Sequence, residues 1–145
     1  MKAEANRMAA EKSTSKHSAP QNKNHARVYS WNVNGIRAAT KKGLDKWVRQ
    51  SNAEIIGLQE VRADHDSIPN EILALDDYHQ HYVAAEKKGY SGVGLLSRRK
   101  PDRLDTSLDE DRFDSEGRLQ IARFGRLIIA NGYFPNGSGK NRSND

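Results

Sequence analysis

Residues 28–38, VYSWNVNGIRA, combine the pattern of a short strand with two asparagines near its end. Side chains alternate between the two faces of a strand, so Ser30, Asn32 and Asn34 are predicted to share one face. A buried amide without a hydrogen-bond partner costs free energy, so this polar face needs a ligand, water or a hydrogen-bonded network. The alternative is a strand that ends in a turn, because Asn-Gly is a common turn dipeptide.

The composition indicates one modest domain. The chain has 145 residues, of which 35% are hydrophobic and 30% are charged, which suffices for one core and is too short for two ordinary domains. No apolar run approaches the length of a membrane span. The chain contains no cysteine, which excludes disulfides, thiolate nucleophiles and cysteine-based zinc sites and fits an intracellular protein.

Residues 1–26 differ in composition from the rest of the chain. They hold five basic and two acidic residues, a balance of +3 out of the formal net charge of +5. Almost none of their side chains could fill a core, so we predict a disordered polar tail. The tail lacks the apolar segment of a secretory signal and makes a poor transit peptide. Because most of the excess charge lies there, the basic balance is only weak support for nucleic-acid binding.

The apolar pattern after the tail predicts an α/β fold with more strands than helices. Leu44, Trp47 and Val48 share one helical face, and Pro69 opens a second, short helix. Two runs, VGLL and LIIA, show no alternation, which suggests strands buried on both faces. Such a sheet needs two covering layers, so either part of the domain is missing or a second copy supplies the cover. The predicted strands are residues 28–33, 55–58, 78–85, 93–97, 119–124 and 127–134.

Polar side chains follow several of these strands at the points where the strands end. Asn32 and Asn34 follow the first strand, and Glu60 follows the second, within EIIGLQEVR. Tyr133 and Asn136 follow the last, within NGYFPNG. In open α/β sheets such strand ends line the ligand crevice.

The chemistry of these side chains favours a metal-assisted reaction at a phosphate. Carboxylate and amide oxygens suit Mg²⁺ or Mn²⁺ better than zinc. One carboxylate with one or two amides leaves most of the metal's coordination shell to water and a phosphate. A metal held in this way can polarise a phosphoryl oxygen, and the tyrosine and asparagine can donate to other phosphate oxygens. The residues therefore outline a site for phosphodiester hydrolysis.

Five motifs in this order resemble one known family. WNVNGIRA, LQEVR, GYSGVGLLSR, SEGR and GYFPNG are similar to motifs of the exonuclease III type apurinic/apyrimidinic endonucleases, within the endonuclease/exonuclease/phosphatase superfamily. The resemblance covers residues 28–136. GYSGVGLLSR discriminates best, because inositol phosphatases and sphingomyelinases of the superfamily share the asparagine and glutamate strand ends without it.

The resemblance implies a fold and a role for each matching residue. The fold is the N-terminal half of a four-layer α/β/β/α sandwich, with one mixed sheet and few helices, over a truncated domain at residues 27–145. Glu60 is the implied metal-binding carboxylate, with Asn34 beside the metal. The implied catalytic residues are Asn32, which supports the site's network, and Tyr133 and Asn136, which contact the scissile phosphate. The implied contacts to the DNA backbone come from Arg37, Arg62, Tyr90 and Arg118.

The resemblance further implies hydrolysis of the DNA backbone on the 5′ side of abasic sites, dependent on Mg²⁺ or Mn²⁺. It also implies 3′–5′ exonuclease and 3′ phosphodiesterase activity. The expected partner is double-stranded DNA with abasic sites or blocked 3′ ends, and no membrane. The full-length protein is expected to be a monomer in the cytoplasm or nucleoid of a bacterium, or in the nucleus of a eukaryote.

The family pattern continues beyond this chain. Members carry an Asp-x-Asn motif and an Asp-His pair in the second half of the domain, and neither follows Tyr133 here. We therefore expect this chain alone to be an inactive fragment. Two alternatives stay open: another phosphoesterase of the superfamily that acts on RNA or lipid, and a non-catalytic DNA-binding remnant.

Overall fold

A four-stranded mixed sheet forms the centre of the computed structural model, which describes residues 25–134. β1 and β2 are parallel, whereas β2 with β4 and β4 with β3 are antiparallel. Their order is β1 (Val28–Asn32), β2 (Ile55–Gln59), β4 (Val93–Ser97) and β3 (His79–Val83). A second, antiparallel sheet has the order β5 (Arg103–Asp105), β6 (Leu119–Phe124) and β7 (Leu127–Gly132).

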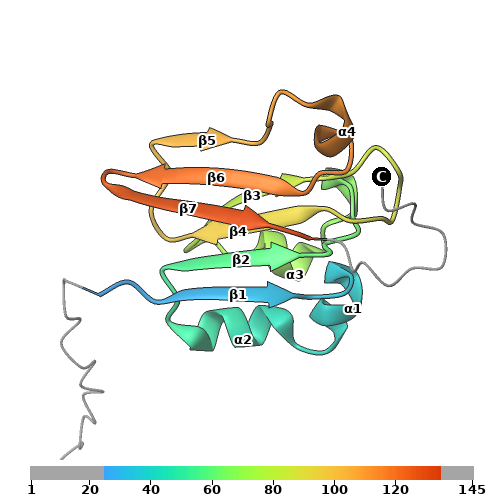
Figure 1. Ribbon diagram of the computed structural model, residues 1–145. Coiled ribbons are helices and arrows are strands. Elements are labelled where there is room, and N and C mark those ends of the chain that lie inside the picture. The colour runs from blue at the N-terminus through green and yellow to red at the C-terminus, as the bar shows by residue number, and fades with distance from the viewer. Residues whose placement is uncertain (1–24, 135–145) are drawn as a thin grey trace, which may run out of the picture.

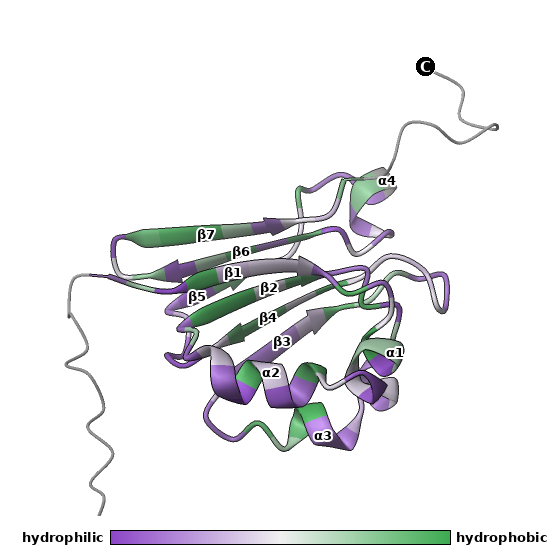
Figure 2. Cartoon of the chain, turned by 90° about the horizontal axis from the view of Figure 1, so that it is seen from below, coloured by the Kyte–Doolittle hydropathy of each residue, from purple (hydrophilic) through white to green (hydrophobic). Residues whose placement is uncertain are grey.

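Four short helices accompany the sheets in the described residues. They are α1 (Ile36–Lys41), α2 (Leu44–Ser51), α3 (Asn70–Leu73) and α4 (Asp111–Asp114), with a 3₁₀ turn at His65–Ser67. Helices α1 to α3 lie along one face of the mixed sheet, and the antiparallel sheet lies along its other face (Figures 1 and 2). The described part of the chain therefore forms three layers.

Apolar side chains fill both interfaces of the mixed sheet. Between this sheet and the helices, one cluster includes Ile36, Val48 and Leu58. A smaller cluster between the two sheets contains Ile55, Leu95, Ala122 and Phe124. All five residues of β2 and all five of β4 are buried, because both strands are central in the sheet and covered on both faces. This confirms the burial that the run VGLL predicted.

The predicted α/β class, with a mixed sheet and few helices, is confirmed. The expectation of one sheet was incomplete, because β6 and β7 pair as a hairpin and β5 adds a third strand. The sequence did not reveal β5, since three residues are too few to show a period. α1 and α4, of six and four residues, were also unpredicted.

The prediction that LIIA is buried on both faces was wrong. Ile129 and Asn131 of β7 face the mixed sheet, whereas Ile128 is 51% exposed. β7 is an edge strand of its sheet, and only one of its faces packs against the mixed sheet. The predicted tail, residues 1–26, lies almost wholly outside the described residues. Within residues 25–134, no helix has the length and apolar character that crossing a membrane requires.

Candidate active site

Glu60 lies at the point where the parallel strands β1 and β2 end. Because Asn32 pairs with Gln59 in the register of these strands, the Asn32 side chain lies beside Glu60. The Asn32 amide Nδ2 donates to Glu60 Oε1 over 3.0 Å, and the Tyr133 hydroxyl donates to the same oxygen over 2.6 Å. The Arg62 guanidinium donates to Glu60 Oε2 over 2.6 Å. One carboxylate, only 15% exposed, therefore joins the ends of both sheets.

The backbone around Glu60 turns sharply and is pinned on both sides. Glu60 and Arg62 both have φ 51°, in the left-handed region that residues other than glycine seldom adopt. The Gly35 N–H donates to the Glu60 carbonyl over 2.7 Å, and the Val61 N–H donates to the Gly92 carbonyl over 3.0 Å. Left-handed non-glycine residues persist only where the surrounding structure holds them, and they gather at functional sites.

The structure supports part of each interpretation of VYSWNVNGIRA, the polar strand face with partners and the strand that ends in a turn. Ser30 and Asn32 reach neighbouring side chains of the second strand, since Ser30 Oγ accepts from Gln59 Nε2 over 3.1 Å. Asn34 does not stay on this face, because the chain turns at φ 47° there. The Asn34 backbone N–H donates to Asn32 Oδ1 over 3.0 Å, which closes an Asx-type turn and orients the Asn32 amide toward Glu60.

A second cluster, the arginine–tyrosine cluster of Arg118, Tyr90 and Tyr133, adjoins the Glu60 site. Arg118 Nη2 donates to the Tyr90 hydroxyl over 2.9 Å, and Nη1 donates to the Tyr133 carbonyl over 3.3 Å. The Arg118 guanidinium lies 4.8 Å from the centre of the Tyr133 ring. Glu116 accepts from Arg118 Nε. The cluster thus places a cation, an aromatic face and a phenol next to Glu60.

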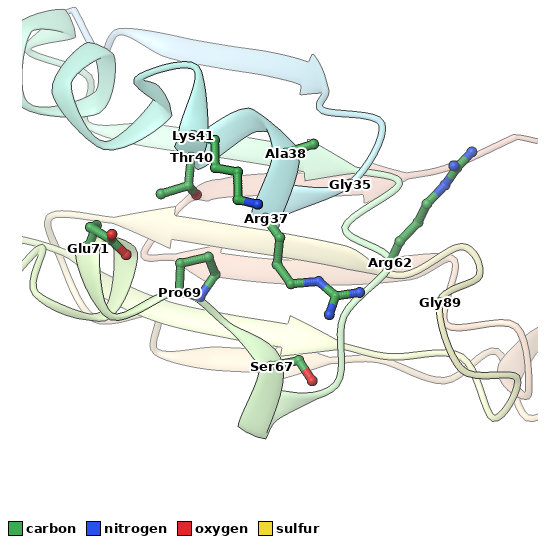
Figure 3. Close-up of a pocket in the computed structure, with 10 residues that line it drawn as sticks. All are labelled: Gly35, Arg37, Ala38, Thr40, Lys41, Arg62, Ser67, Pro69, Glu71 and Gly89. Atoms are coloured by element: carbon green, nitrogen blue, oxygen red, sulfur yellow. The ribbon is translucent and has the colours of Figure 1, made fainter.

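A basic hollow of about 650 Å³ lies on the α1 side of the site. Arg37 and Lys41 from α1 line it together with Arg62 from the loop after β2, and Glu71 contributes one acidic side chain (Figure 3). Because Arg62 also pairs with Glu60, this residue borders both the hollow and the Glu60 site. This excess of positive charge favours an anionic ligand.

The hydrogen bonds around Glu60 change the acidity of two groups in opposite directions. The Tyr133 and Asn32 hydrogen bonds, together with the charge of Arg62, lower the pKa of Glu60, although burial opposes them. The same Glu60 hydrogen bond, burial and the negative charge of Glu60 raise the pKa of Tyr133. At neutral pH the site therefore holds a carboxylate and a protonated phenol that can donate.

Removing the Tyr133 hydroxyl tests this arrangement. In Tyr133→Phe the pKa of Glu60 should rise toward the ordinary glutamate value, as read from the Glu60 carboxyl carbon in an NMR titration. Because the folded pKa is lowered, the native hydrogen bond stabilises the fold above the unfolded pKa, and this contribution is lost as pH falls through the folded pKa. Tyr133→Phe should reduce this loss of stability at low pH. An unchanged pKa of Glu60 would contradict the hydrogen bond between Tyr133 and Glu60.

The donor set at the strand ends fits a hydrated Mg²⁺. Its oxygens are hard donors, and a single carboxylate leaves most of the octahedral shell to water, which Mg²⁺ retains readily. Arg62, which holds one Glu60 oxygen, is 45% exposed and has room to move aside. Among residues 25–134 there is no group of three or more histidine, aspartate or glutamate side chains that could hold a metal. A metal at these strand ends would have Glu60 as its charged ligand among the described residues.

The structure brings most of the predicted site residues together. The contacts already described join Asn32, Glu60, Arg62, Tyr133, Tyr90 and Arg118. Arg37 lies apart from them in the basic hollow, and Asn34 takes part through its backbone. Asn136 lies outside the described residues.

Two further residues were not predicted. Glu116 lies within the SEGR motif, and Asn131 lies within NGYFPNG, so the motifs contained them. Their roles depend on partners in other segments, which no local pattern reveals.

The fold and site define a phosphoesterase-type α/β sandwich, and comparison with known proteins identifies the family. The model of the Endonuclease/Exonuclease/phosphatase family matches residues 29–143. The chain belongs to this family.

Among the relatives, the DNA repair nuclease APEX1 of Danio rerio is 37% identical over 131 residues, which are 88% of this chain and 41% of that protein. The exodeoxyribonuclease of Bacillus subtilis is 33% identical over 76% of this chain and 43% of its own length. An AP endonuclease structure from Archaeoglobus fulgidus shares the fold with a TM-score of 0.64 at 24% identity, over 75% of this chain and 41% of that one. The chain spans about two fifths of each.

Proposed function

We propose that this chain carries the part of a metal-dependent DNA-repair nuclease that contains Glu60. The whole nuclease would hydrolyse the phosphodiester 5′ to abasic sites and process 3′ ends. The observation that carries the proposal is the convergence of Asn32, Arg62 and Tyr133 on one carboxylate at the strand ends. Relatives named as a DNA repair nuclease and an exodeoxyribonuclease support DNA as the substrate.

Glu60, with Asn34 beside it, would hold Mg²⁺, which supplies charge stabilisation at a phosphoryl oxygen and at the leaving group. Asn32 fixes the orientation of the Glu60 carboxylate through its 3.0 Å hydrogen bond. Tyr133 keeps its proton, and its hydroxyl would turn from Glu60 to donate a hydrogen bond to a phosphate oxygen when the substrate binds. The Asn136 amide would donate to a phosphate oxygen as well. Arg37 and Arg62 would provide positive charge for the DNA backbone from the basic hollow, and Tyr90 and Arg118 would contact the backbone from the arginine–tyrosine cluster.

We further propose that this chain alone is not a competent nuclease. Among the described residues no three histidine, aspartate or glutamate side chains are grouped so that they could hold a metal, and Glu60 is the one carboxylate that Asn32, Arg62 and Tyr133 hold. This observation also favours a second candidate, a chain that binds damaged DNA without cleaving it. Both candidates predict DNA binding at the same surface.

Binding and cleavage of a defined panel test the function. The panel contains an abasic-site duplex, the matching intact duplex, an RNA duplex and sphingomyelin vesicles, each with Mg²⁺. We expect preferential binding of the abasic duplex, because a nucleotide without a base is easiest to turn out of the stack. Any cleavage should fall 5′ to the abasic site and leave a 3′ hydroxyl. Equal affinity for intact and abasic DNA, or hydrolysis of RNA or lipid, would overturn the proposal.

The basic hollow predicts a specific salt dependence. If Arg37 neutralises a phosphate, Arg37→Gln should make the slope of log K against log salt shallower by roughly 0.9. Lys46→Gln removes the same charge from an exposed position on α2, outside the hollow, and should leave the slope unchanged. Fluorescence anisotropy with a labelled duplex at several salt concentrations provides the measurement. Equal slopes for wild type and Arg37→Gln would exclude this contact.

A further inference from the structure

We propose that Asn131 is a positioning residue, whose buried amide ties β7 to β2 and β4 and thereby holds Tyr133 against Glu60. Its importance for hydrolysis rests on the proposed function, whereas the positioning itself is a property of the fold.

The Asn131 side chain is fully paired inside the interface between the two sheets. The residue is 4% exposed. Its Oδ1 accepts from Gln59 Nε2 over 2.7 Å. Its Nδ2 donates to the Gly94 carbonyl over 2.9 Å, and to the Leu58 carbonyl and Gln120 Oε1 over 3.3 Å. Displacing the amide would leave several buried polar groups without hydrogen-bond partners, and such unpaired groups cost free energy.

Gly57 provides the space for this contact. A Cβ atom added at Gly57 would lie 2.9 Å from Asn131 Oδ1, and the three nearest atoms to that position all belong to Asn131. The φ of Gly57 is not in the left-handed region, so its backbone suits any residue. The absence of a side chain at Gly57 therefore serves the approach of the Asn131 amide to β2.

The two side chains that this amide hydrogen bond joins lie close in sequence to Glu60 and Tyr133. Gln59 immediately precedes Glu60, and Asn131 lies two residues before Tyr133. Residues two apart on a strand point to the same face, and the Tyr133 N–H continues the β6–β7 ladder by donating to the Arg118 carbonyl over 2.9 Å. The Asn131 amide thus binds the middle of the mixed sheet, and the Tyr133 hydroxyl reaches the end of β2.

The remainder of the inter-sheet interface fixes the position of β7 against the mixed sheet less closely. It comprises an apolar cluster of Ile55, Leu95, Ala122 and Phe124, with Ile129 packed against it, and one polar contact of β6, in which Gln120 Nε2 donates to the His81 carbonyl over 2.9 Å. Hydrophobic contact is non-directional, so it keeps the sheets together while tolerating small displacements along the strands. Hydrogen bonds with fixed geometry remove that freedom. The Gln120 amide ties β6 to β3, whereas the Asn131 amide ties β7 itself to β2 and β4 and thereby fixes β7 relative to Glu60.

Two variants and one matched control test the proposal in the full chain, without metal or DNA. Asn131→Leu removes the amide at similar size, and Gly57→Ala pushes it aside while keeping it. Ile129→Ala deletes an apolar side chain from the same face of β7. The readout is the through-space NMR contact between the Tyr133 ring and the Glu60 side chain.

We expect this contact to be lost in Asn131→Leu, weakened in Gly57→Ala and retained in Ile129→Ala. If Asn131→Leu does not fold, Gly57→Ala decides, because only the Asn131 side chain must move to accommodate its methyl group. A contact of wild-type strength in either folded variant, or equal loss in Ile129→Ala, would overturn the proposal. Failure to bind abasic-site DNA with the contact intact would count against the proposed function alone.

Discussion

Exchanging Glu60 for glutamine is expected to weaken Mn²⁺ binding by roughly 10- to 100-fold or more, a range that holds even for residues one shell away from a metal. Glutamine keeps the shape of the side chain and one neutral oxygen but removes the charge. The exchange matters because Glu60 is the only carboxylate that Asn32 and Tyr133 jointly orient at the described strand ends. The signal of free Mn²⁺ in electron paramagnetic resonance measures the affinity.

Glu54→Gln is the matched control for this experiment. Glu54 precedes β2 and lies at the opposite end of the strand from Glu60, where it accepts a hydrogen bond from the Arg27 N–H over 2.5 Å. The control removes the same charge without touching the site, so its Mn²⁺ affinity should equal that of wild type. Wild-type affinity in Glu60→Gln would show that the metal binds elsewhere.

Gly117→Ala is expected to destabilise the fold by about 2–5 kcal/mol, as the sum of a left-handed backbone and overpacking. Gly117 has φ 57°, and an added Cβ would lie 2.6 Å from the backbone carbonyl carbon and oxygen of Ala84. Backbone atoms in a pinned loop cannot yield as a flexible side chain can. The substitution should also separate Arg118, the next residue, from Tyr90.

Gly125→Ala separates the two causes of that loss. Gly125 has φ 61°, but nothing lies within 4 Å of an added Cβ. It should therefore lose only the backbone term, about 1–2 kcal/mol. Urea unfolding of both variants supplies the free energies. Equal losses of the free energy of unfolding in the two variants would show that contact with Ala84 adds nothing to the cost of Gly117→Ala.

Much of the fold could be predicted because its strands are short apolar runs with clear ends. The predicted bounds of residues 93–97 and 119–124 agree with β4 and β6, and the other predicted strands differ by a few residues at their ends. The prediction for LIIA failed because an edge strand can carry apolar side chains on a face that no element of the described residues covers. Local pattern cannot distinguish that case from a central strand.

The candidate site was predictable to the level of residue types but not of contacts. The position of Glu60 after an apolar strand, and the asparagines after another, indicated oxygen donors at one sheet edge. The Glu60 to Tyr133 hydrogen bond joins residues 73 positions apart and depends on the packing of two sheets. The same holds for Gln59 and Asn131. Such contacts arise from tertiary structure, so sequence motifs can contain the residues without revealing their partners.

The most direct test of the Glu60 site is the affinity of the wild-type chain for an abasic-site duplex, measured with Mg²⁺ and with chelator at equal ionic strength. If a metal on Glu60 also contacts a DNA phosphate, metal and DNA must strengthen each other's binding reciprocally. We predict tighter DNA binding with Mg²⁺ in wild type, and no such gain in Glu60→Gln. A wild-type affinity that ignores Mg²⁺, or an equal gain in Glu60→Gln, would contradict a metal-assisted phosphodiester site at these strand ends.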